Sequence, residues 1–189
     1  MGKYKLAAFD MDGTLLNSGK QISDTTKEMI RRAAKEGKII ALSTGRGLAE
    51  LYEYLDQVPE VRYLDCTSGA MVYDCHEKKV IARRAIAVPH MKKILEIARQ
   101  EDVMIHFLST RSIVQKSKLE EMEDYYMGVY KPMFETVADQ CEDIYQFYMD
   151  HLVPMEKCNI YHHTTEERAI TEERIKAADL PVVMVHSEV

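Results

Sequence analysis

The chain has 189 residues, of which 46% are hydrophobic and 30% charged, so it can form a packed core in one ordinary domain or two small ones. A net charge of −6 and the lack of a long basic run argue against nucleic acid or an anionic membrane as the main partner. No segment approaches the roughly 20 apolar residues of a spanning helix, and the N-terminus lacks the apolar region of a signal peptide. The cysteines are widely spaced, without a C-x-x-C pair, which favours free thiols in a reducing cytoplasm over a zinc site.

Short apolar runs alternate with amphipathic stretches in the first third of the chain. They predict three buried strands, at residues 5–9, 38–43 and 61–66. Between them lie two helical patterns. Ser23 and Gly37 are suitable N- and C-terminal caps for the first helix, and Pro59 ends the second. Strand, helix, strand, helix, strand in this order predicts the start of a doubly wound α/β fold with a parallel sheet.

The pattern changes after the third strand. A hairpin is predicted over residues 71–84, and a separate α+β module follows it. The expected helices of this module begin at Pro89 and cover about 118–127, 134–151 and 166–178; the expected strands cover 103–108, 112–116, 157–162 and 181–186. We therefore expect two domains, at residues 1–85 and 86–189.

Polar residues and glycines follow each of the three predicted parallel strands. Asp10 and Asp12 end the first strand, and Thr44 and Ser68 follow the second and third. These strand ends share one edge of the sheet, where ligands bind. Two neighbouring carboxylates repel each other unless a cation or a proton lies between them. The pattern predicts a phosphoryl group held against Mg²⁺, with one carboxylate as nucleophile and the other transferring a proton.

These motifs resemble those of a known family. D-x-D-G-T-L-L from Asp10, S-T-G-R from Ser43 and S-G-A from Ser68, with a hairpin that leads into an α+β insert, resemble the haloacid dehalogenase (HAD) superfamily and its Cof-type phosphatase branch. The resemblance covers the whole chain. It implies part of a Rossmann-like α/β core (βαβαβ) plus an α+β cap, and a small phosphorylated metabolite, such as a sugar phosphate or a phosphorylated cofactor, as substrate. This branch usually has Asn where Ser68 stands.

The resemblance also implies roles for individual residues. Asp10 would be the nucleophile that forms an aspartyl-phosphate, and Asp12 the general acid/base that lends its backbone carbonyl to Mg²⁺. The metal would therefore be held at these two aspartates. The remaining roles are phosphate binding by Thr44, Gly45 and Gly13, and a substrate loop of Arg46, Ser68 and Gly69.

One part of the family pattern is not found. The family has a lysine after the cap and an acidic G-D-x-x-N-D-like motif, and nothing after residue 86 has that form. The sequence therefore predicts the front part of a longer phosphatase, truncated before these motifs and weakly active or inactive as this chain. It also predicts that the first strand is an open sheet edge, through which the chain self-associates or pairs with a complementary piece.

Other interpretations remain open. The chain could be a non-catalytic remnant that binds phosphate, metal or a partner protein through the open edge. A receiver-like domain also uses acids and Mg²⁺ at strand ends, but the insert after residue 86 argues against it. Arg46 is as well suited to pair with an acid as to contact a substrate. His162 and His163 suggest a metal less than a structural role, because adjacent strand residues face opposite ways.

Overall fold

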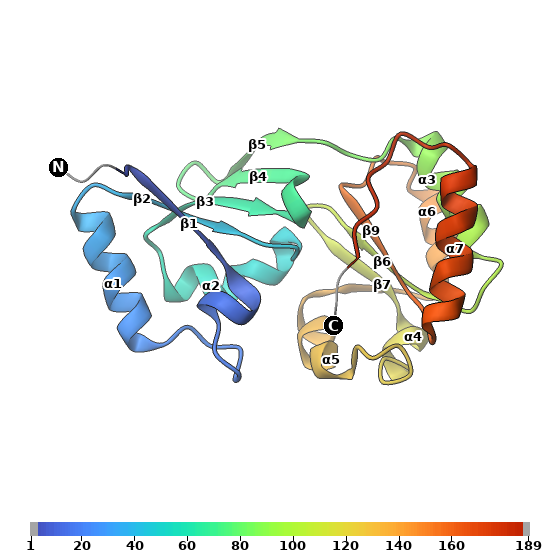
Figure 1. The fold of residues 1–189 in the computed structure, drawn as a ribbon, viewed down its shortest axis with the longest axis horizontal. Helices are drawn as coiled ribbons and strands as arrows, with labels where there is room; N and C mark the ends of the chain where they lie inside the picture. The colour runs from blue at the N-terminus through green and yellow to red at the C-terminus, as the bar shows by residue number, and fades with distance from the viewer. Residues whose placement is uncertain (1–3, 187–189) are drawn as a thin grey trace. The chain divides into compact units, whose positions relative to one another are not determined.

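The computed structural model describes residues 4–186 and divides the chain into two compact units, Met1–Arg84 and Ala85–Val189 (Figure 1). Each unit contains one β-sheet with its own helices and its own hydrophobic clusters. None of the helices between residues 4 and 186 has the length and apolar character that a membrane span needs.

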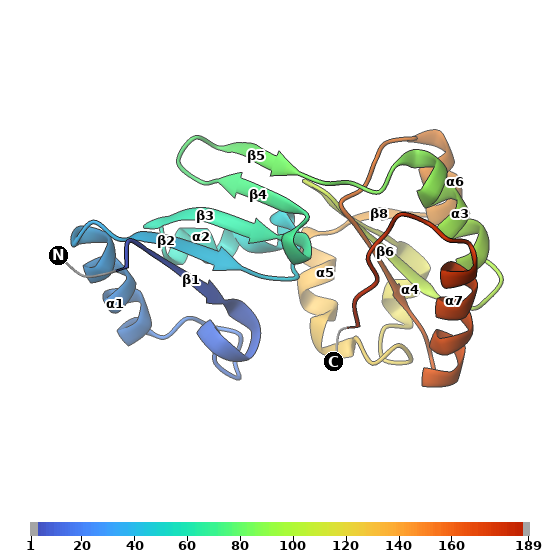
Figure 2. The same ribbon diagram turned by 45° about the horizontal axis from the view of Figure 1, so that its top comes forward.

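The first unit contains a five-stranded sheet in the order β1-β2-β3-β4-β5 (Figure 2). The first three strands are parallel to one another, and the last two form the antiparallel hairpin that the sequence predicts. The bounds are β1 Leu6–Asp10, β2 Ile39–Ser43, β3 Val61–Cys66, β4 Met71–Asp74 and β5 Lys79–Arg83. The predicted α/β class is confirmed.

Two helices connect the parallel strands. Helix α1 (Asp24–Lys35) follows β1, and α2 (Tyr52–Gln57) continues a short 3₁₀ turn after β2. Ser23 caps α1 as predicted, because its hydroxyl accepts a hydrogen bond of 3.2 Å from the Thr26 amide. When successive right-handed crossovers add strands in the same direction across a sheet, their helices lie on the same face of that sheet. Figure 1 shows α1 and α2 on one side of the sheet.

Strand β1 lies at the edge of the sheet and pairs with β2 alone among the described strands. The expectation that this strand is buried is wrong, since Leu6 is 50% exposed and Ala8 is also exposed. Apolar composition predicts burial only where another element covers the strand. Here no described helix covers the face that carries Leu6 and its β2 neighbour Ile39.

The second unit contains a four-stranded sheet in the order β8-β7-β6-β9. Its central pair is antiparallel, and helices cover both faces. Side chains therefore alternate along β6: Ile105 and Phe107 pack with α3 and α6, whereas Met104 packs with α4 and α5. The bounds are α3 Val88–Ala98, β6 Met104–Leu108, β7 Ser112–Gln115, α4 Lys116–Glu120, α5 Lys131–Val137, β8 Asp139–Cys141, α6 Ile144–Asp150, β9 Lys157–Tyr161 and α7 Thr165–Ala177.

Three predicted elements of this unit are wrong. The helix expected at 118–127 is limited to α4, which ends at Glu120. The helix expected at 134–151 is two helices with β8 between them, because residues 139–141 pair with β7 and the Asp143 carboxylate caps a new helix. The strand expected at 181–186 does not form. A strand needs a neighbour, and this segment instead packs some of its apolar side chains against α3 and α7.

Candidate functional site

The parallel register brings three polar side chains of the first unit into one row. Asp10 of β1 pairs with Ser43 of β2, and Ser43 pairs with Asp65 of β3. Residues paired across a sheet point to the same face. The row closes one side of a pocket of about 340 Å³ at the carboxyl ends of these strands; its lining residues are Asp10, Ser43, Thr44, Gly45, Asp65, Ser68 and Gly69.

Asp10 is held by the turn that follows β1. The Thr14 hydroxyl donates a hydrogen bond of 2.9 Å to Oδ2 of Asp10. The turn closes with a 2.9 Å bond from the Leu16 amide to the Met11 carbonyl, and Gly13 has a φ of 76° within it. Such a φ favours glycine, so the role of Gly13 that the backbone explains is to let the chain reverse after the two aspartates.

Backbone hydrogen bonds join the loops after β2 and β3. The Thr67 amide donates to the Arg46 carbonyl at 2.8 Å, and the Ser68 amide donates to the Thr44 carbonyl at 3.2 Å. Three successive residues at this rim are left-handed, with φ of 53° at Thr67, 57° at Ser68 and 87° at Gly69. Left-handed conformations of non-glycine residues are strained and concentrate at binding sites. The joined loops hold this strained turn at the rim of the pocket.

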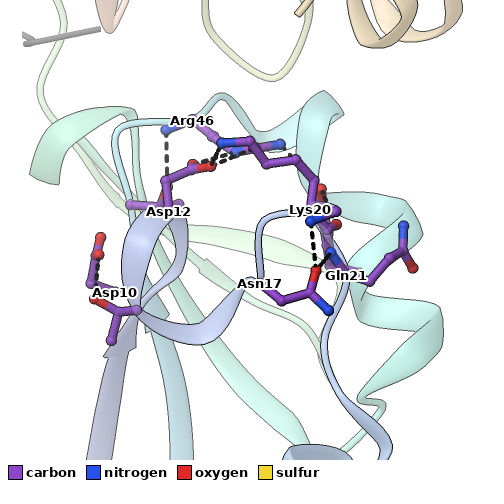
Figure 3. A network of polar contacts seen from close by, with 10 residues as sticks. Asp10, Asp12, Asn17, Lys20, Gln21 and Arg46 are labelled. Carbon is purple, nitrogen blue, oxygen red and sulfur yellow. Dashed lines mark hydrogen bonds and ion pairs between the residues drawn. The ribbon is translucent and has the colours of Figure 1, made fainter. Parts of the chain in front are cut away.

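The Asp12 side chain binds two cations and is not part of the pocket lining. Nε and Nη2 of Arg46 donate hydrogen bonds of 2.8 Å to its two carboxylate oxygens, and Lys20 Nζ donates another of 2.9 Å. Figure 3 shows the Asp12 carboxylate turned toward Arg46, with Asp10 on the other side of the turn. Tyr54 completes this cluster, because Arg46 Nη1 donates to its hydroxyl at 3.4 Å and the guanidinium lies 5.4 Å from its ring. We call Asp12, Arg46, Lys20 and Tyr54 the Asp12 clamp.

The clamp fixes the charge of Asp12. Hydrogen bonds from Arg46 lower the pKa of the Asp12 carboxyl to about 2, against an opposing effect of burial and with a further contribution from Lys20. The pKa of Arg46 is raised by the hydrogen bonds and charge of Asp12, although burial, its largest single influence, acts to lower it. Asp12 is therefore an anion at any ordinary pH, and its side chain has no proton to donate while the clamp is closed.

The sequence profile of the haloacid dehalogenase-like hydrolases matches residues 7–180, which is most of the chain. The chain belongs to this family. The family predicted from its motifs is thereby confirmed, in the Cof-type phosphatase branch.

Several bacterial proteins are sequence relatives of this HAD chain. YxeH of Bacillus subtilis is 28% identical over 113 residues, which cover 58% of this chain and 42% of YxeH. A 5-amino-6-(5-phospho-D-ribitylamino)uracil phosphatase of B. subtilis, YcsE, is 30% identical over 98 residues, which cover 52% of this chain and 39% of that enzyme. The chain thus spans about two fifths of the length of these curated relatives.

Solved structures share the fold of the HAD chain. A haloacid dehalogenase-like hydrolase from Bacteroides thetaiotaomicron superposes with a TM-score of 0.75 at 21% identity, over 90% of this chain and 63% of that one. The HAD subclass IIB sugar phosphatase BT4131 superposes with a TM-score of 0.70 at 19% identity, over 91% of this chain and 64% of that one. At these identities the likeness supports the fold, which agrees with the predicted α/β core plus an α+β cap.

The structure brings together five of the residues that the sequence singles out. Asp10, Thr44, Gly45, Ser68 and Gly69 all line the pocket of the HAD chain. The other three are not lining residues: Gly13 lies in the turn after Asp12, and Asp12 and Arg46 bind each other beside the pocket.

Sequence reasoning missed Ser43 and Asp65, which line the pocket, and Lys20, which closes the clamp. Ser43 and Asp65 could have been found, because each stands near the end of a predicted parallel strand. Lys20 could not, since only the tight turn at residues 17–21, held by bonds to Oδ1 of Asn17, carries it back to Asp12.

The pocket offers a limited set of metal donors. Among residues 4–186 there is no group of three or more His, Cys, Asp or Glu side chains placed to hold a metal ion. Mg²⁺ is commonly bound through one or two carboxylates, with substrate phosphates and water completing its shell. The Asp10 carboxylate in the pocket fits that pattern, whereas the Asp12 carboxylate is occupied by Arg46 and Lys20.

Proposed function

We propose that this chain carries the nucleophile side of a Mg²⁺-dependent phosphatase site for a small phosphorylated metabolite. The observation that supports this most is the pocket itself, whose lining combines a strand-end carboxylate, a threonine and two glycine-bearing loops. Relatives that are named as phosphatases of small molecules, YcsE and an HMP-PP phosphatase of Cronobacter sakazakii, support the substrate class. The four cysteines are free thiols, in keeping with a cytoplasmic protein.

Asp10 is the proposed nucleophile. Thr14 binds Oδ2, so Oδ1 is the oxygen that attacks phosphorus. The new bond to Oδ1 gives an aspartyl-phosphate, the ester P–O bond breaks, and the leaving oxygen takes up a proton. Water then attacks the phosphorus and loses a proton, the bond from phosphorus to Oδ1 breaks, and inorganic phosphate leaves with Asp10 restored as a carboxylate.

Thr44 and the surrounding glycines are the proposed phosphoryl-binding groups. The Thr44 hydroxyl oxygen accepts a 3.2 Å hydrogen bond from the Arg46 amide, so its own hydrogen is left to donate to a phosphoryl oxygen. Gly45 and Gly69 line the pocket without side chains, which lets the ligand approach the backbone closely. When bound, Mg²⁺ would neutralise charge on the phosphoryl group, and Asp10 and the Asp12 carbonyl would hold it.

Asp12 is the proposed proton-transferring group, and the clamp limits it. A carboxyl group with a pKa of about 2 is unprotonated near neutral pH, so it has no proton for a leaving group, and its carboxylate is a weak base toward water. Asp12 therefore has to leave Arg46 before it acts as an acid. In addition, no pocket-lining residue in the described part of the chain is Lys or Arg, so the pocket itself offers no side-chain cation to the phosphoryl group. We propose that turnover by this chain is weak.

The same two features favour a second candidate function, the binding of phosphate esters and Mg²⁺ without turnover. One experiment distinguishes the two functions. Hydrolysis and binding of an aryl phosphate are measured with Mg²⁺ and with a chelator, for the wild-type chain and for Asp10→Asn. Slow Mg²⁺-dependent hydrolysis that Asp10→Asn abolishes supports the phosphatase. Mg²⁺-dependent binding with no hydrolysis supports the binding function, and the absence of binding rejects both.

We also propose that β1 is a self-association surface. An open strand edge presents unpaired backbone groups, and Leu6 and Ile39 leave apolar surface beside it. Light scattering is measured at a chain concentration on the order of tens of micromolar, which exceeds the Kd of a weak dimer in the low micromolar range. The wild-type chain should be a dimer under these conditions. Leu6→Lys should give a monomer. Ile81→Lys is the matched control, because Ile81 lies on the opposite edge strand, β5, and is similarly exposed at 49%. A wild-type chain that is already a stable monomer contradicts the proposal.

A further inference from the structure

The pocket contains a second carboxylate, Asp65, that the proposed phosphoryl transfer does not use. It lies near the end of β3, and Ser43 stands between it and Asp10 in the cross-strand row. Neighbouring strands are about 4.8 Å apart, so the backbones of Asp10 and Asp65 are separated by roughly 10 Å. Both side chains line the same pocket, so a phosphate ester whose phosphoryl group lies against Asp10 can extend its organic part toward Asp65.

Asp65 is held by one hydrogen bond to its side chain and one to its backbone carbonyl. The Ser43 hydroxyl donates a hydrogen bond of 2.9 Å to Oδ2. Oδ1 faces the strained turn, since a Cβ added to Gly69 would meet that atom at 3.9 Å. The backbone carbonyl of Asp65 also accepts a 2.9 Å bond from the Thr44 amide, which ties β3 to the phosphoryl-binding loop. The carboxylate is therefore oriented before any ligand arrives.

The charge of Asp65 is unsuited to the phosphoryl group itself. A carboxylate repels a phosphate, and the repulsion weakens with distance and with solvent. It accepts hydrogen bonds from hydroxyl groups and attracts ammonium groups, and bonds of this kind to a charged group are stronger than neutral ones. The pocket volume, about 340 Å³, lies in the range of about 300–1,000 Å³ for small-ligand sites, which leaves room for an organic group beside a phosphate.

We propose that Asp65, oriented by Ser43, determines specificity by accepting a hydrogen bond from a hydroxyl or ammonium group on the organic part of the phosphate ester. This inference rests on the proposed phosphate-ester site. It names the substrate class as phosphorylated polyols or amino alcohols, rather than aryl or alkyl phosphates. Ser43 is a positioning residue, because it acts through Asp65.

The test uses pairs of esters that share a carbon skeleton and differ in one kind of donor. Glycerol 2-phosphate is compared with isopropyl phosphate for hydroxyl groups, and phosphoethanolamine with ethyl phosphate for the ammonium group. Binding to the full chain is measured with Mg²⁺ by calorimetry, so that the result does not depend on turnover. The wild-type chain should bind at least one donor-bearing ester roughly 10-fold or more tightly than its alkyl partner, as expected for one hydrogen bond to a charged acceptor.

Asp65→Asn should reduce this preference to about threefold or less, while its affinity for the alkyl phosphate stays the same or rises. Ser43→Ala should reduce the preference in part. Asp56→Asn, a surface change outside the pocket lining, should leave it unaltered. Thermal unfolding of each variant checks its fold, and Asp65→Asn retains an oxygen for the Ser43 bond.

The outcomes separate this inference from the proposed function. If the alkyl phosphates bind in a way that depends on Asp10 but the wild-type chain shows no preference for either donor, the role of Asp65 is rejected and the phosphate-ester site stands. A preference that survives unchanged in Asp65→Asn rejects the role equally. If no phosphate ester binds in the presence of Mg²⁺, the proposed function fails, and the role of Asp65 fails with it.

Discussion

Two titratable groups, Asp12 in the first unit and His106 in the second, have lowered pKa values for different physical reasons. In the first unit, polar side chains gather at the open ends of parallel strands, and the Asp12 clamp stabilises a charge there. In the second unit, helices cover both faces of the sheet, and the buried His106 forms hydrogen bonds with two neutral partners, Ser112 at 2.6 Å and Asn159 at 3.4 Å. The pKa of Asp12 falls to about 2 because cations bind its carboxylate, and that of His106 falls to about 3 because burial disfavours its cation. The charge of the neighbouring groups and the degree of burial together decide whether a titratable side chain stays ionised.

The largest expected loss of stability comes from a substitution in the core of the second unit. It tests whether the two units unfold independently of each other. Phe107 is fully buried between α3 and α6, so Phe107→Ala should destabilise the second unit by about 3–5 kcal/mol. Native-state hydrogen exchange should show faster exchange of β6 amides with little change in β2. Tyr126→Ala, at a side chain that is 71% exposed, is the control, with an expected change within about 0.5 kcal/mol. Equal losses of hydrogen-exchange protection in both sheets would show that the two units unfold as one cooperative core. The contrast between the units would then no longer hold.

The next effect concerns the clamp. Arg46 is 9% exposed, and Arg46→Ala leaves the Asp12 carboxylate without two of its hydrogen bonds. The expected loss of unfolding free energy is about 2 kcal/mol, less than for a fully buried pair because Asp12 remains partly exposed. Arg31→Ala removes an exposed ion pair with Glu28 and should cost less than about 1 kcal/mol. Denaturant unfolding compares the two variants, and equal losses would mean that the clamp is an ordinary surface pair.

The clamp also predicts a pH dependence. The folded-state pKa of Asp12, about 2, lies below its unfolded-state value of 3.8, so its stabilising contribution is complete above about pH 4. It is lost as the pH falls from 4 toward 2. Asp12→Asn should remove this part of the pH dependence of stability. The curves of the wild-type chain and Asp12→Asn should therefore converge at acid pH, and parallel curves would contradict the lowered pKa.

The contrasting case is His106. Its folded-state pKa of about 3 lies below the unfolded value of 6.5, so the unfolded chain binds the proton first. The stability of the second unit should be complete above pH 6.5 and should decrease by about 1–2 kcal/mol as the pH falls to 5. His106→Gln should be less stable at pH 7 but should lose less between pH 7 and 5. Thermal unfolding at the two pH values measures this, and equal slopes would mean that His106 does not set the dependence.

The smallest expected effect on stability concerns Ser68, in the strained turn at the rim of the pocket. Ser68 is exposed and has a φ of 57°, a conformation that glycine adopts freely and asparagine tolerates better than serine. Ser68→Gly and Ser68→Asn should each stabilise the first unit, by about 0.5 kcal/mol. Ser117→Gly, on the exposed surface of helix α4, is the control and should destabilise by up to about 1 kcal/mol. Calorimetric melting separates these signs, and destabilisation by both changes at Ser68 would mean that its side chain supports the rim.

The left-handed turn also explains a sequence observation. The branch to which this chain is similar usually has Asn at the position of Ser68. Because Asn is one of the few residues that visit the left-handed region readily, its use there follows from the backbone. Serine keeps a hydroxyl in the pocket lining at the cost of some strain.

Local sequence determined much of this protein. Apolar runs that end in D-x-D, T-G-R and S-G-A were sufficient for the parallel strands, for the family and for five of the pocket residues, since strand ends in a parallel sheet meet at one edge. Ser23, Gly37 and the hairpin after β3 were equally readable, because caps and turns depend on a few neighbouring residues.

The tertiary structure decided what depends on distant partners. Sequence composition could not show that residues 139–141 join β7 as a strand, or that residues 181–186 find no strand to pair with. It placed Asp10 and Asp12 together at one strand end, as nucleophile and proton-transferring group of the same site. Only the fold turns Asp10 toward the pocket and brings Arg46 and Lys20 to Asp12, because charge is set by the groups that meet a side chain in space.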